Sequence, residues 1–232
     1  MKTKLISLIA NVSLIAQYGK IQRAGLDNSH AYPGYGTPVA IDTSFVVKIS
    51  NSQLLVNLLS MQNRLKEIIG DHHAFNQIPE TMHLTLLNHL FNADASIVYD
   101  LQSEVKNADS IFRGVKLSPW SIHFKGLLVT PNSIIVKGYD NGVANGYRHQ
   151  LVASGIDQNI YDNDKINNVY PNIVHIKLIN FKTPLDKSII QTINNKFGNT
   201  FFGSETVENV HLRNFDLNAM YSPGTTYHLY HL

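Results

Sequence analysis

Residues 81–88 read TMHLTLLN and residues 172–180 read NIVHIKLIN, and these two stretches decide the fold that the sequence predicts. Each alternates between apolar and polar positions, which is the period of a half-buried β-strand. Residues i and i+2 of a strand share a face, so His83 lies beside Thr85 in the first stretch and His175 beside Lys177 in the second. Each predicted strand therefore presents an imidazole next to a hydrogen-bond donor.

The two stretches occupy equivalent places in an apparent internal repeat. His175 follows His83 by 92 residues. The same shift places two predicted helices, beginning at Asn51 and Ala95, on segments beginning at Val143 and Lys187. Each half then reads strand, helix, strand, helix, although the residues themselves are barely similar. We therefore expect two related lobes.

Apolar periodicity in the rest of the chain predicts a mixed fold. Helices are predicted over residues 51–70, 95–105, 144–151 and 183–197, the second capped by Asp94 and the last by Thr183 with Pro184 in its first turn. Further strands are predicted over residues 39–49, 120–129, 133–137, 209–218 and 225–232. Residues 18–38 are rich in Gly, Pro and Asn and predict an ordered loop. The pattern favours an α+β, bilobal, pseudo-twofold fold with two mostly antiparallel sheets around a central cleft and helices outside.

Composition excludes several classes of protein. The chain has 232 residues, 44% apolar and 16% charged, so it can bury a large core and is not disordered. Its formal net charge of +2 is too small for a protein that coats nucleic acid, and we expect no binding of duplex DNA. The absence of Cys excludes thiol nucleophiles, iron–sulfur clusters and Cys-ligated zinc.

The first 16 residues allow two interpretations. Two lysines within residues 1–4 precede an apolar stretch over residues 5–16, which is typical of a secretory signal peptide. The same residues fit an amphipathic first helix, because Lys4, Ser7 and Asn11 fall on one face. A signal peptide would predict a secreted or periplasmic protein that starts near Gln17, and a helix would predict a cytoplasmic one. No apolar run is long enough for a permanent transmembrane helix.

The paired motifs predict acid–base chemistry on a phosphate. If the lobes are related by a pseudo-twofold axis, the two motif strands become neighbours and bring His83 and His175 together. Two imidazoles in opposite protonation states can serve as base and acid in one displacement. Thr85 and Lys177 would then bind the non-bridging phosphate oxygens.

This arrangement resembles the two-histidine (2H) phosphoesterase superfamily, whose members carry two His-apolar-Ser/Thr motifs in a bilobal fold. Residues 32–39, YPGYGTPV, are similar to a Phe-Pro-Gly-x-Thr stretch of a little-characterised microbial branch. The resemblance covers residues 18–232 and implies metal-independent action on phosphodiesters or cyclic phosphates, without a cofactor. Lys177 departs from the pattern, since the family has Ser or Thr there, which either tunes substrate choice or marks a lobe that has lost catalysis.

Other residues compete for a role. His123 and Lys125 repeat the spacing of the second motif, but they have no partner under the 92-residue shift. His72 and His73 are expected to be a solvated loop pair rather than a metal site. His149 is expected to be exposed, and His211, His228 and His231 to be half-buried and structural. Tyr35 and Tyr170 are candidate substrate-binding residues that could stack on a nucleobase.

The sequence therefore predicts a monomeric phosphodiesterase that uses His83, Thr85, His175 and Lys177 on a nucleotide, cyclic phosphate or RNA-derived substrate. The alternative is a protein that captures such a ligand without turning it over. A third interpretation is an interaction protein in which the paired histidines are incidental.

Overall fold

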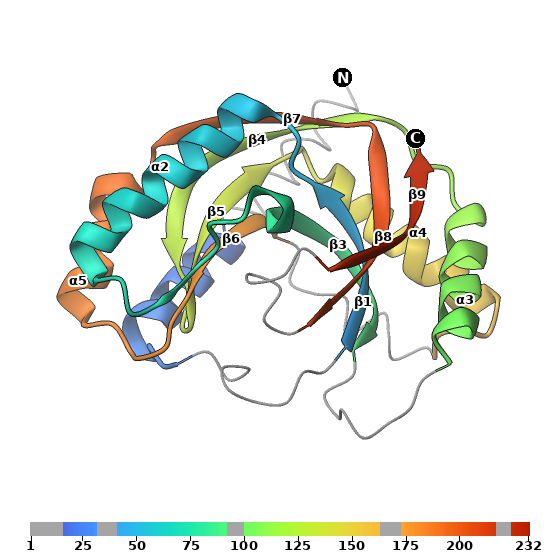
Figure 1. Ribbon diagram of the computed structural model, residues 1–232, viewed down its shortest axis with the longest axis horizontal. Helices are drawn as coiled ribbons and strands as arrows, with labels where there is room; N and C mark the ends of the chain where they lie inside the picture. Colours follow the sequence, from blue (N-terminus) through green and yellow to red (C-terminus); the bar gives the residue numbers. More distant parts are fainter. Residues whose placement is uncertain (1–15, 32–40, 92–99, 163–172, 217–223) are drawn as a thin grey trace.

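The computed structural model describes residues 16–31, 41–91, 100–162, 173–216 and 224–232, which form two antiparallel sheets with helices outside them (Figure 1). One sheet has the strand order β3 (His83–Phe91), β1 (Ile41–Lys48), β8 (Asn209–Asp216) and β9 (Thr225–His231). The other has the order β2 (Ala74–Phe75), β6 (Val174–Asn180), β5 (Ser133–Tyr139), β4 (Trp120–Val129) and β7 (Phe201–Val207). The α+β class and the two antiparallel sheets are confirmed.

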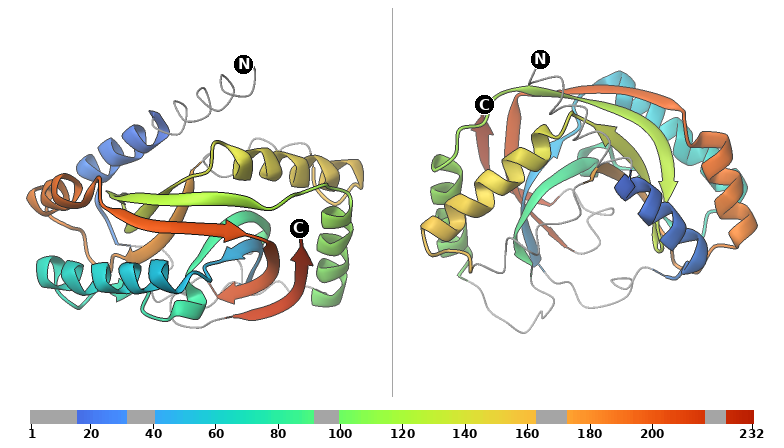
Figure 2. Two further views of the ribbon diagram at one scale, coloured as in Figure 1. Left: turned by 90° about the horizontal axis from the view of Figure 1, so that it is seen from above. Right: turned by 180° about the vertical axis from the view of Figure 1, so that it is seen from behind.

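The helices cover the two sides of the molecule (Figure 1, Figure 2). On one side lie α2 (Ser52–Ile69) and α5 (Lys187–Phe197), and on the other lie α3 (Leu101–Arg113) and α4 (Val143–Asp157). A short 3₁₀ helix, η1 (Pro79–Thr81), leads directly into β3. No helix among the described residues combines the length and apolar character needed to cross a membrane.

The predicted element order occurs in both halves of the chain. The first half contains β1, α2, β3 and α3, and the second contains β5, α4, β6 and α5. In each half the motif strand pairs with the strand that precedes it, β3 with β1 and β6 with β5. The 92-residue shift matches β1 to β5 and places α2 within one residue of α4, but α3 begins at Leu101 rather than Ala95. The repeat is thus one of element order, with β2 and η1 added in the first half.

Several predicted boundaries need correction. Residues 16–27 form a helix, whereas a loop was expected from residue 18, because Tyr18 packs with Leu128, Ile135 and Ile173 against the second sheet. Asp186, instead of Thr183, occupies the N-cap position of the last helix, without a capping hydrogen bond from its side chain. The helix expected from Ala95 is capped by Asp100, whose side chain accepts from the Gln102 amide. Strand β7 was not predicted, because its sequence FFGSETV lacks a regular alternation.

Some predictions fall on residues that lie outside the described ones. These are the alternatives for residues 1–15, the YPGYGTPV stretch over residues 32–39, the expected cap Asp94, and the candidate substrate-binding residues Tyr35 and Tyr170.

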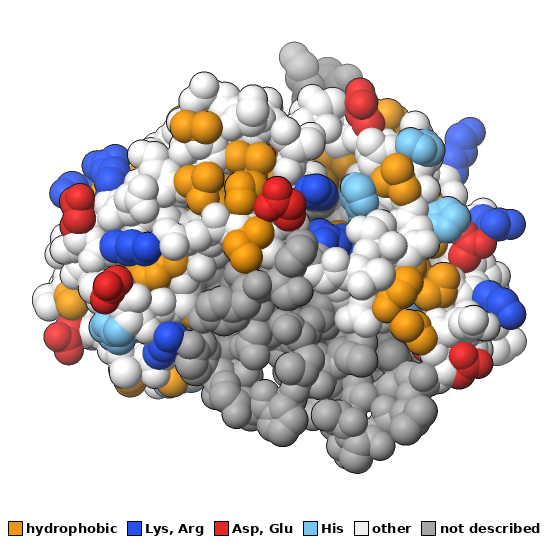
Figure 3. Space-filling view, in the orientation of Figure 1, with side chains coloured by type: hydrophobic (Ala, Val, Ile, Leu, Met, Phe, Trp, Pro, Cys, Tyr) orange, Lys and Arg blue, Asp and Glu red, His pale blue; other side chains and the backbone are white. Residues whose placement is uncertain are grey.

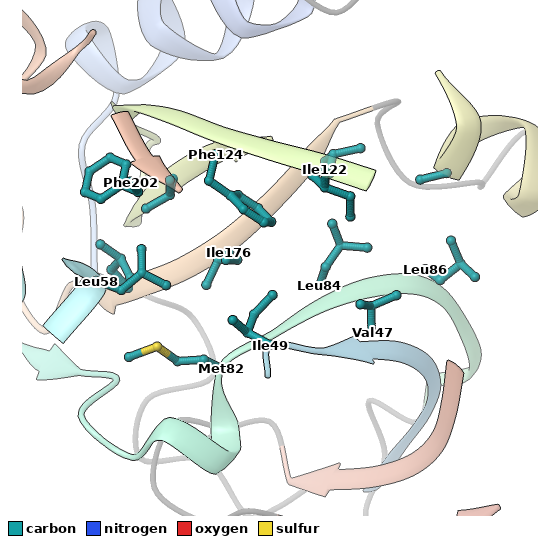
Figure 4. Close-up of a cluster of buried hydrophobic side chains, with 14 of the residues drawn as sticks. Val47, Ile49, Leu58, Met82, Leu84, Leu86, Ile122, Phe124, Ile176 and Phe202 are labelled. Atoms are coloured by element: carbon teal, nitrogen blue, oxygen red, sulfur yellow. The ribbon is translucent and has the colours of Figure 1, made fainter. Parts of the chain in front are cut away.

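The main core lies between the two sheets and orients both motifs. Figure 4 shows Leu84 of β3 and Ile176 of β6 pointing into one apolar cluster, together with Val47 and Phe124. Leu84 and Ile176 are fully buried, and each directly follows the histidine of its motif. Because successive strand residues point to opposite faces, burying these two side chains turns His83 and His175 away from the core.

Candidate active site

His83 and His175 lie on strands that contact each other. The contact joins β3 of the first sheet to β6 of the second, so residues 92 apart in the sequence meet in one place. Both imidazoles are half-buried, as are Thr85 and Lys177 beside them. The charge of Lys177 acts on both imidazoles, and the two imidazoles act on each other. The structure thus brings His83, His175 and Lys177 together, and Thr85 follows His83 by two residues in β3.

The backbone two residues earlier acts differently on the two imidazoles. Nδ1 of His83 donates to the carbonyl oxygen of Thr81 at 2.7 Å. The backbone of Ile173 has only a small raising effect on the pKa of His175, and the buried Nδ1 of His175 has no hydrogen-bond partner among the described residues. A ring that donates through Nδ1 carries its lone pair on Nε2, so the second nitrogen is the one suited to accept a proton from a reacting group.

The surroundings keep both imidazoles neutral. Burial is the main cause that lowers the pKa of His83 to about 4; the positive charges of Arg213 and Lys177 contribute to this lowering, and the Thr81 hydrogen bond opposes it. Burial, together with the charges of Lys177 and Arg148, lowers the pKa of His175 to about 3. Two neutral imidazoles among cations are weak bases in the free protein, and a bound anion would raise their basicity by offsetting those positive charges.

Lys177 is the cation that belongs to the second motif. Burial lowers the pKa of its amine to about 8, so the group is mostly charged at neutral pH and loses its charge in mildly alkaline solution. An ammonium is a point charge with three rotatable donors, whereas the hydroxyl of Thr85 is a short neutral donor. The two motifs therefore offer different chemistry to the same phosphate.

Arg148 of α4 ties the two motif strands together, which the sequence did not predict. Its guanidinium is 2% exposed and donates to the carbonyl oxygens of Leu86 at 2.8 Å, Thr85 at 3.0 Å and Ile173 at 3.1 Å. Asp140, whose carboxylate accepts from the Ala144 amide at 2.6 Å, supplies a nearby negative charge. One feature of the sequence could have indicated a buried role for Arg148. This charged residue follows Ala144 by four positions and precedes Leu151 by three, so it lies on the apolar face of the predicted helix.

Asn76 makes a second polar bridge between the motifs. Its Nδ2 donates to the carbonyl oxygen of Lys177 at 3.1 Å, and its Oδ1 accepts from the hydroxyl of Thr81. Gln62 of α2 in turn donates to the Asn76 carbonyl oxygen. The backbone that anchors His83 is thereby linked to the strand that carries His175. Nothing in the sequence distinguishes Asn76 from other loop asparagines.

Arg213 of β8 adds another cation beside His83. The residue is 4% exposed, and its Nη1 donates to the carbonyl oxygen of Glu80 at 3.1 Å. Glu80 belongs to η1, directly before the Thr81 carbonyl that holds His83. The sequence showed only that residue 213 lies in a predicted strand, and the sheet order decides that this strand lies next to β1.

The face shown in Figure 3 displays basic and histidine side chains close together near its centre, with an acidic side chain beside them. A cavity of about 430 Å³ has a lining that includes Lys48, His211, Glu80, Glu205 and Glu208, and none of the four motif residues belongs to that lining. The Glu205 carboxylate accepts from the Ser50 hydroxyl at 2.6 Å and from the Asn51 amide at 3.0 Å, at the start of α2. Glu205 therefore stabilises this helix end.

The remaining histidines have structural surroundings. His123 is exposed, and its Nδ1 lies 2.7 Å from the Ser204 hydroxyl. His72 is exposed, as expected. His73 is buried and accepts from the Lys182 amide at 3.2 Å, so the prediction of a solvated pair is wrong for His73. The described residues hold no group of three or more potential metal ligands.

The expectations for the other histidines are confirmed for two and wrong for two. His149 is exposed and His211 is half-buried, as predicted. His228 and His231 are exposed, because the polar positions of β9 lie at the edge of their sheet. His89, which the motif analysis left aside, is buried with its Nδ1 2.7 Å from the Tyr161 hydroxyl and its Nε2 3.3 Å from the Glu104 carboxylate.

Two solved structures are similar to this one. The crystal structure of TT0787 of Thermus thermophilus has a TM-score of 0.57 and 17% sequence identity, and the alignment covers 82% of this chain and 97% of that one. A conserved protein of unknown function from Agrobacterium tumefaciens, ATU0111, has a TM-score of 0.47 and 12% identity over 87% of this chain and 89% of that one. No family model and no curated protein matches the chain. At 17% identity the first likeness shows an α+β fold rich in antiparallel sheet.

Proposed function

We propose that this protein is a metal-independent phosphodiesterase of the two-histidine type, acting on a nucleotide, a cyclic phosphate or an RNA-derived diester. One observation carries the proposal: His83 and His175 occupy matched positions on contacting strands, and each is followed by a residue buried in the common core. Incidental histidines have no reason to share this strand position and also to lie within electrostatic reach of each other and of Lys177. Thr85 and Lys177 add the donors that a phosphate needs.

In the proposed reaction the negative charge of the substrate changes the protonation state of the two imidazoles. The phosphate binds between Thr85 and Lys177, and its negative charge raises the pKa of both imidazoles, so one of them holds a proton while the other stays neutral. The neutral ring takes a proton from the attacking water as its oxygen bonds to phosphorus. The ester P–O bond breaks, and the protonated ring gives its proton to the departing oxygen. The two rings exchange protonation states, and a solvent proton transfer resets them.

The alternative is a protein that binds the same ligand without turnover, and Lys177 is the observation that favours it. Replacement of a compact hydroxyl by a flexible ammonium keeps anion binding but changes the geometry around the phosphate. The low pKa of both imidazoles in the free protein also means that the proton for the leaving group must come with, or after, the substrate.

Turnover of a panel of phosphodiesters in the presence of EDTA tests the proposal. The panel contains 2′,3′-cyclic and 3′,5′-cyclic nucleotides, a dinucleotide and bis(4-nitrophenyl) phosphate. We expect turnover of at least one of them, unchanged by the chelator and strongly reduced in His83→Ala. His123→Ala is the matched control, because it removes an exposed histidine with the same His-x-Lys spacing. Binding without turnover would support the alternative, and activity that needs added zinc would contradict the metal-free site.

A further inference from the structure

The cavity of about 430 Å³ borders the first motif, although it contains none of the motif residues. Lys48, in its lining, is the cross-strand partner of His83. Directly opposite residues of antiparallel strands lie roughly 4.5–5.5 Å apart at their Cα atoms, and their side chains point to one face. Glu80 also belongs to the lining, and it directly precedes Thr81, whose carbonyl oxygen holds the His83 ring. The cavity is therefore next to His83 both through β1 and through η1.

His211 connects the same cavity to the face of the first sheet that carries Thr85. Thr85 of β3 is paired with Val46 of β1, and Val46 is paired in turn with His211 of β8. Thr85 and His211 therefore share one face of the sheet, two strands or about 10 Å apart. The half-buried ring of His211 lines the cavity and has no hydrogen-bond partner among the described residues. This ring is thus available to a ligand.

The rest of the lining has an apolar part and an acidic part. Apolar side chains come from Leu55, Pro79 and Val207. The side chains of Glu80 and Glu208 are exposed, and neither carboxylate has a hydrogen bond or an ion pair with another described residue. An ionised carboxylate accepts hydrogen bonds and does not donate them. The acidic part of the cavity therefore suits a ligand group that donates hydrogen bonds.

The charges of the lining limit the class of group that fits. A second phosphate would meet the carboxylates of Glu80, Glu205 and Glu208 against the ammonium of Lys48, and the negative charges would repel it. A purely apolar group would cover the carboxylates without giving them hydrogen bonds, which costs free energy. A group that has several N–H or O–H donors and no negative charge avoids both costs.

The size of the cavity limits the ligand as well. A volume of about 430 Å³ lies near the lower end of the range for small-molecule sites, roughly 300–1,000 Å³. Such a cavity holds a single sugar or nucleoside rather than a chain of nucleotides. The apolar part of its lining can contact the face of a ring while the carboxylates accept from the donors at its edge.

We propose that this cavity binds the uncharged, hydrogen-bond-donating group attached to the scissile phosphate, which is the sugar or the base of a nucleotide, and that Glu80 and Glu208 accept its hydrogen bonds. This inference rests on the proposed function and narrows its substrate class. Lys48, as the partner of His83, lies on the side of the cavity toward the phosphate. His211 lines the same cavity and contacts the bound group.

Two substrates with opposite expected responses test the inference. One is the best nucleotide of the panel, and the other is bis(4-nitrophenyl) phosphate, which has one negative charge and no N–H or O–H donor. In Glu208→Gln we expect kcat/KM for the nucleotide to fall about tenfold, as for a weakened hydrogen bond to a charged acceptor. For bis(4-nitrophenyl) phosphate it should rise about two- to threefold, because the variant removes a negative charge that repels the anionic diester.

A second variant and a control accompany this measurement. Glu80→Gln should shift the two substrates in the same opposite directions, and it keeps the inference testable if Glu208→Gln folds poorly. The matched control is Glu67→Gln, since Glu67 is an exposed glutamate of α2 outside the cavity lining. This control removes the same charge and should change neither substrate.

Two analogues of the nucleotide identify which part of it donates. One analogue lacks the base, and the other has its free sugar hydroxyls methylated. The analogue that lacks the donor in contact with Glu208 should no longer respond to Glu208→Gln, because a contact that is already absent cannot be lost again. An effect that persists in the analogue without the base assigns the contact to the sugar, and one that persists in the methylated analogue assigns it to the base.

The outcomes separate this inference from the proposed function. An unchanged kcat/KM for the nucleotide in both glutamate variants, or an equal change for the two substrates, would overturn the inference and leave the phosphodiesterase standing. If nothing in the panel is turned over, binding of the common uncharged nucleosides, followed through the NMR signal of the His211 ring, decides. A shift of this signal that is weakened in Glu208→Gln would support the cavity site while the proposed catalysis fails. No shift with any of the nucleosides would overturn the inference as well.

Discussion

The two motif strands are alike in what surrounds their histidines and different in the residue beside them. In both, the residue after the histidine is buried in the common core. The backbone two residues earlier accepts a hydrogen bond from the His83 ring, whereas the His175 Nδ1 has no hydrogen-bond partner among the described residues. The companion residue is Thr85 in β3 and Lys177 in β6. The strand position that the two motifs share therefore sets the direction of the imidazoles, while the charge of the companion residue belongs to the second motif.

The two motifs are also supported differently. Behind β3 lies η1, with Arg213 on the Glu80 carbonyl. Next to β6 lies the helix over residues 16–27 (Figure 2), whose Tyr18 hydroxyl donates to the Val174 carbonyl oxygen at 2.6 Å. The same hydroxyl accepts from the Gly138 amide at 3.2 Å. The helix over residues 16–27 is thus a structural partner of the second motif.

The largest effect is expected at the two histidines. If the two halves contribute equally, His83→Ala and His175→Ala should each lower kcat by roughly 10²- to 10⁴-fold, as for the loss of a general acid or base. Steady-state kinetics with the best substrate of the panel measures this, and the melting temperature checks the fold. Full activity in either variant would show that only one half is catalytic.

The second-largest effect is a loss of stability, expected when Arg148, which links the two motif strands, is replaced. Arg148→Met should lower the free energy of unfolding by about 3 kcal/mol, because it leaves buried carbonyl oxygens of both motif strands without their donor. Urea unfolding measures the loss. Arg113→Met is the control, as its side chain is 76% exposed and forms an ion pair with Asp109 in the preceding turn of α3. Equal stability of the two variants would mean that the strands are held together by apolar packing alone.

Replacing Lys177 tests the difference between the two companion residues directly. Lys177→Thr restores the pattern of the first motif and removes a positive charge, so kcat/KM should fall more for substrates with an extra phosphate than for singly charged diesters. Lys177→Met, which deletes the donor, should lower kcat/KM for both, by about tenfold. If both variants match the unmodified protein in rate and affinity, Lys177 has no part in phosphate recognition.

The pH dependence of phosphate affinity also tests the role of Lys177. The pKa of Lys177 is about 8, below the usual lysine range, so the amine is charged below pH 8 and neutral above it. Phosphate affinity, and with it kcat/KM, should therefore fall as the pH rises through 8. In Lys177→Arg the guanidinium stays charged and this decline should disappear. A decline that persists in the arginine variant belongs to another group.

The smallest effect is expected at Tyr18, whose hydroxyl supports the second motif. Tyr18→Phe keeps the ring but deletes the hydroxyl that contacts β5 and β6, so the protein should lose about 1 kcal/mol of stability. Hydrogen exchange at β6 amides should increase more than at β3 amides. Equal increases at the two strands would show that the N-terminal helix stabilises the whole molecule rather than the second half.

Much of this architecture was predictable because it depends on local periodicity. The alternation in residues 81–88 and 172–180 predicted β3 and β6, and the capping residues Asn51 and Gly70 predicted both ends of α2. The helix over residues 16–27 was missed because its formation depends on burying Tyr18 against the second sheet, which no local pattern records. Arg148 and Asn76 were missed because their partners are backbone carbonyls distant in the sequence.

The sequence by itself determined which side chains face away from the core, since the period of a strand follows from backbone geometry and from the cost of burying polar groups. It also determined that the two motifs differ by a charge. Only the tertiary structure decided that β3 and β6 meet, that Arg213 comes beside His83, and that burial among cations lowers the pKa of both imidazoles. Those properties depend on distances between segments far apart in the chain, and such distances are set by the packing of whole sheets.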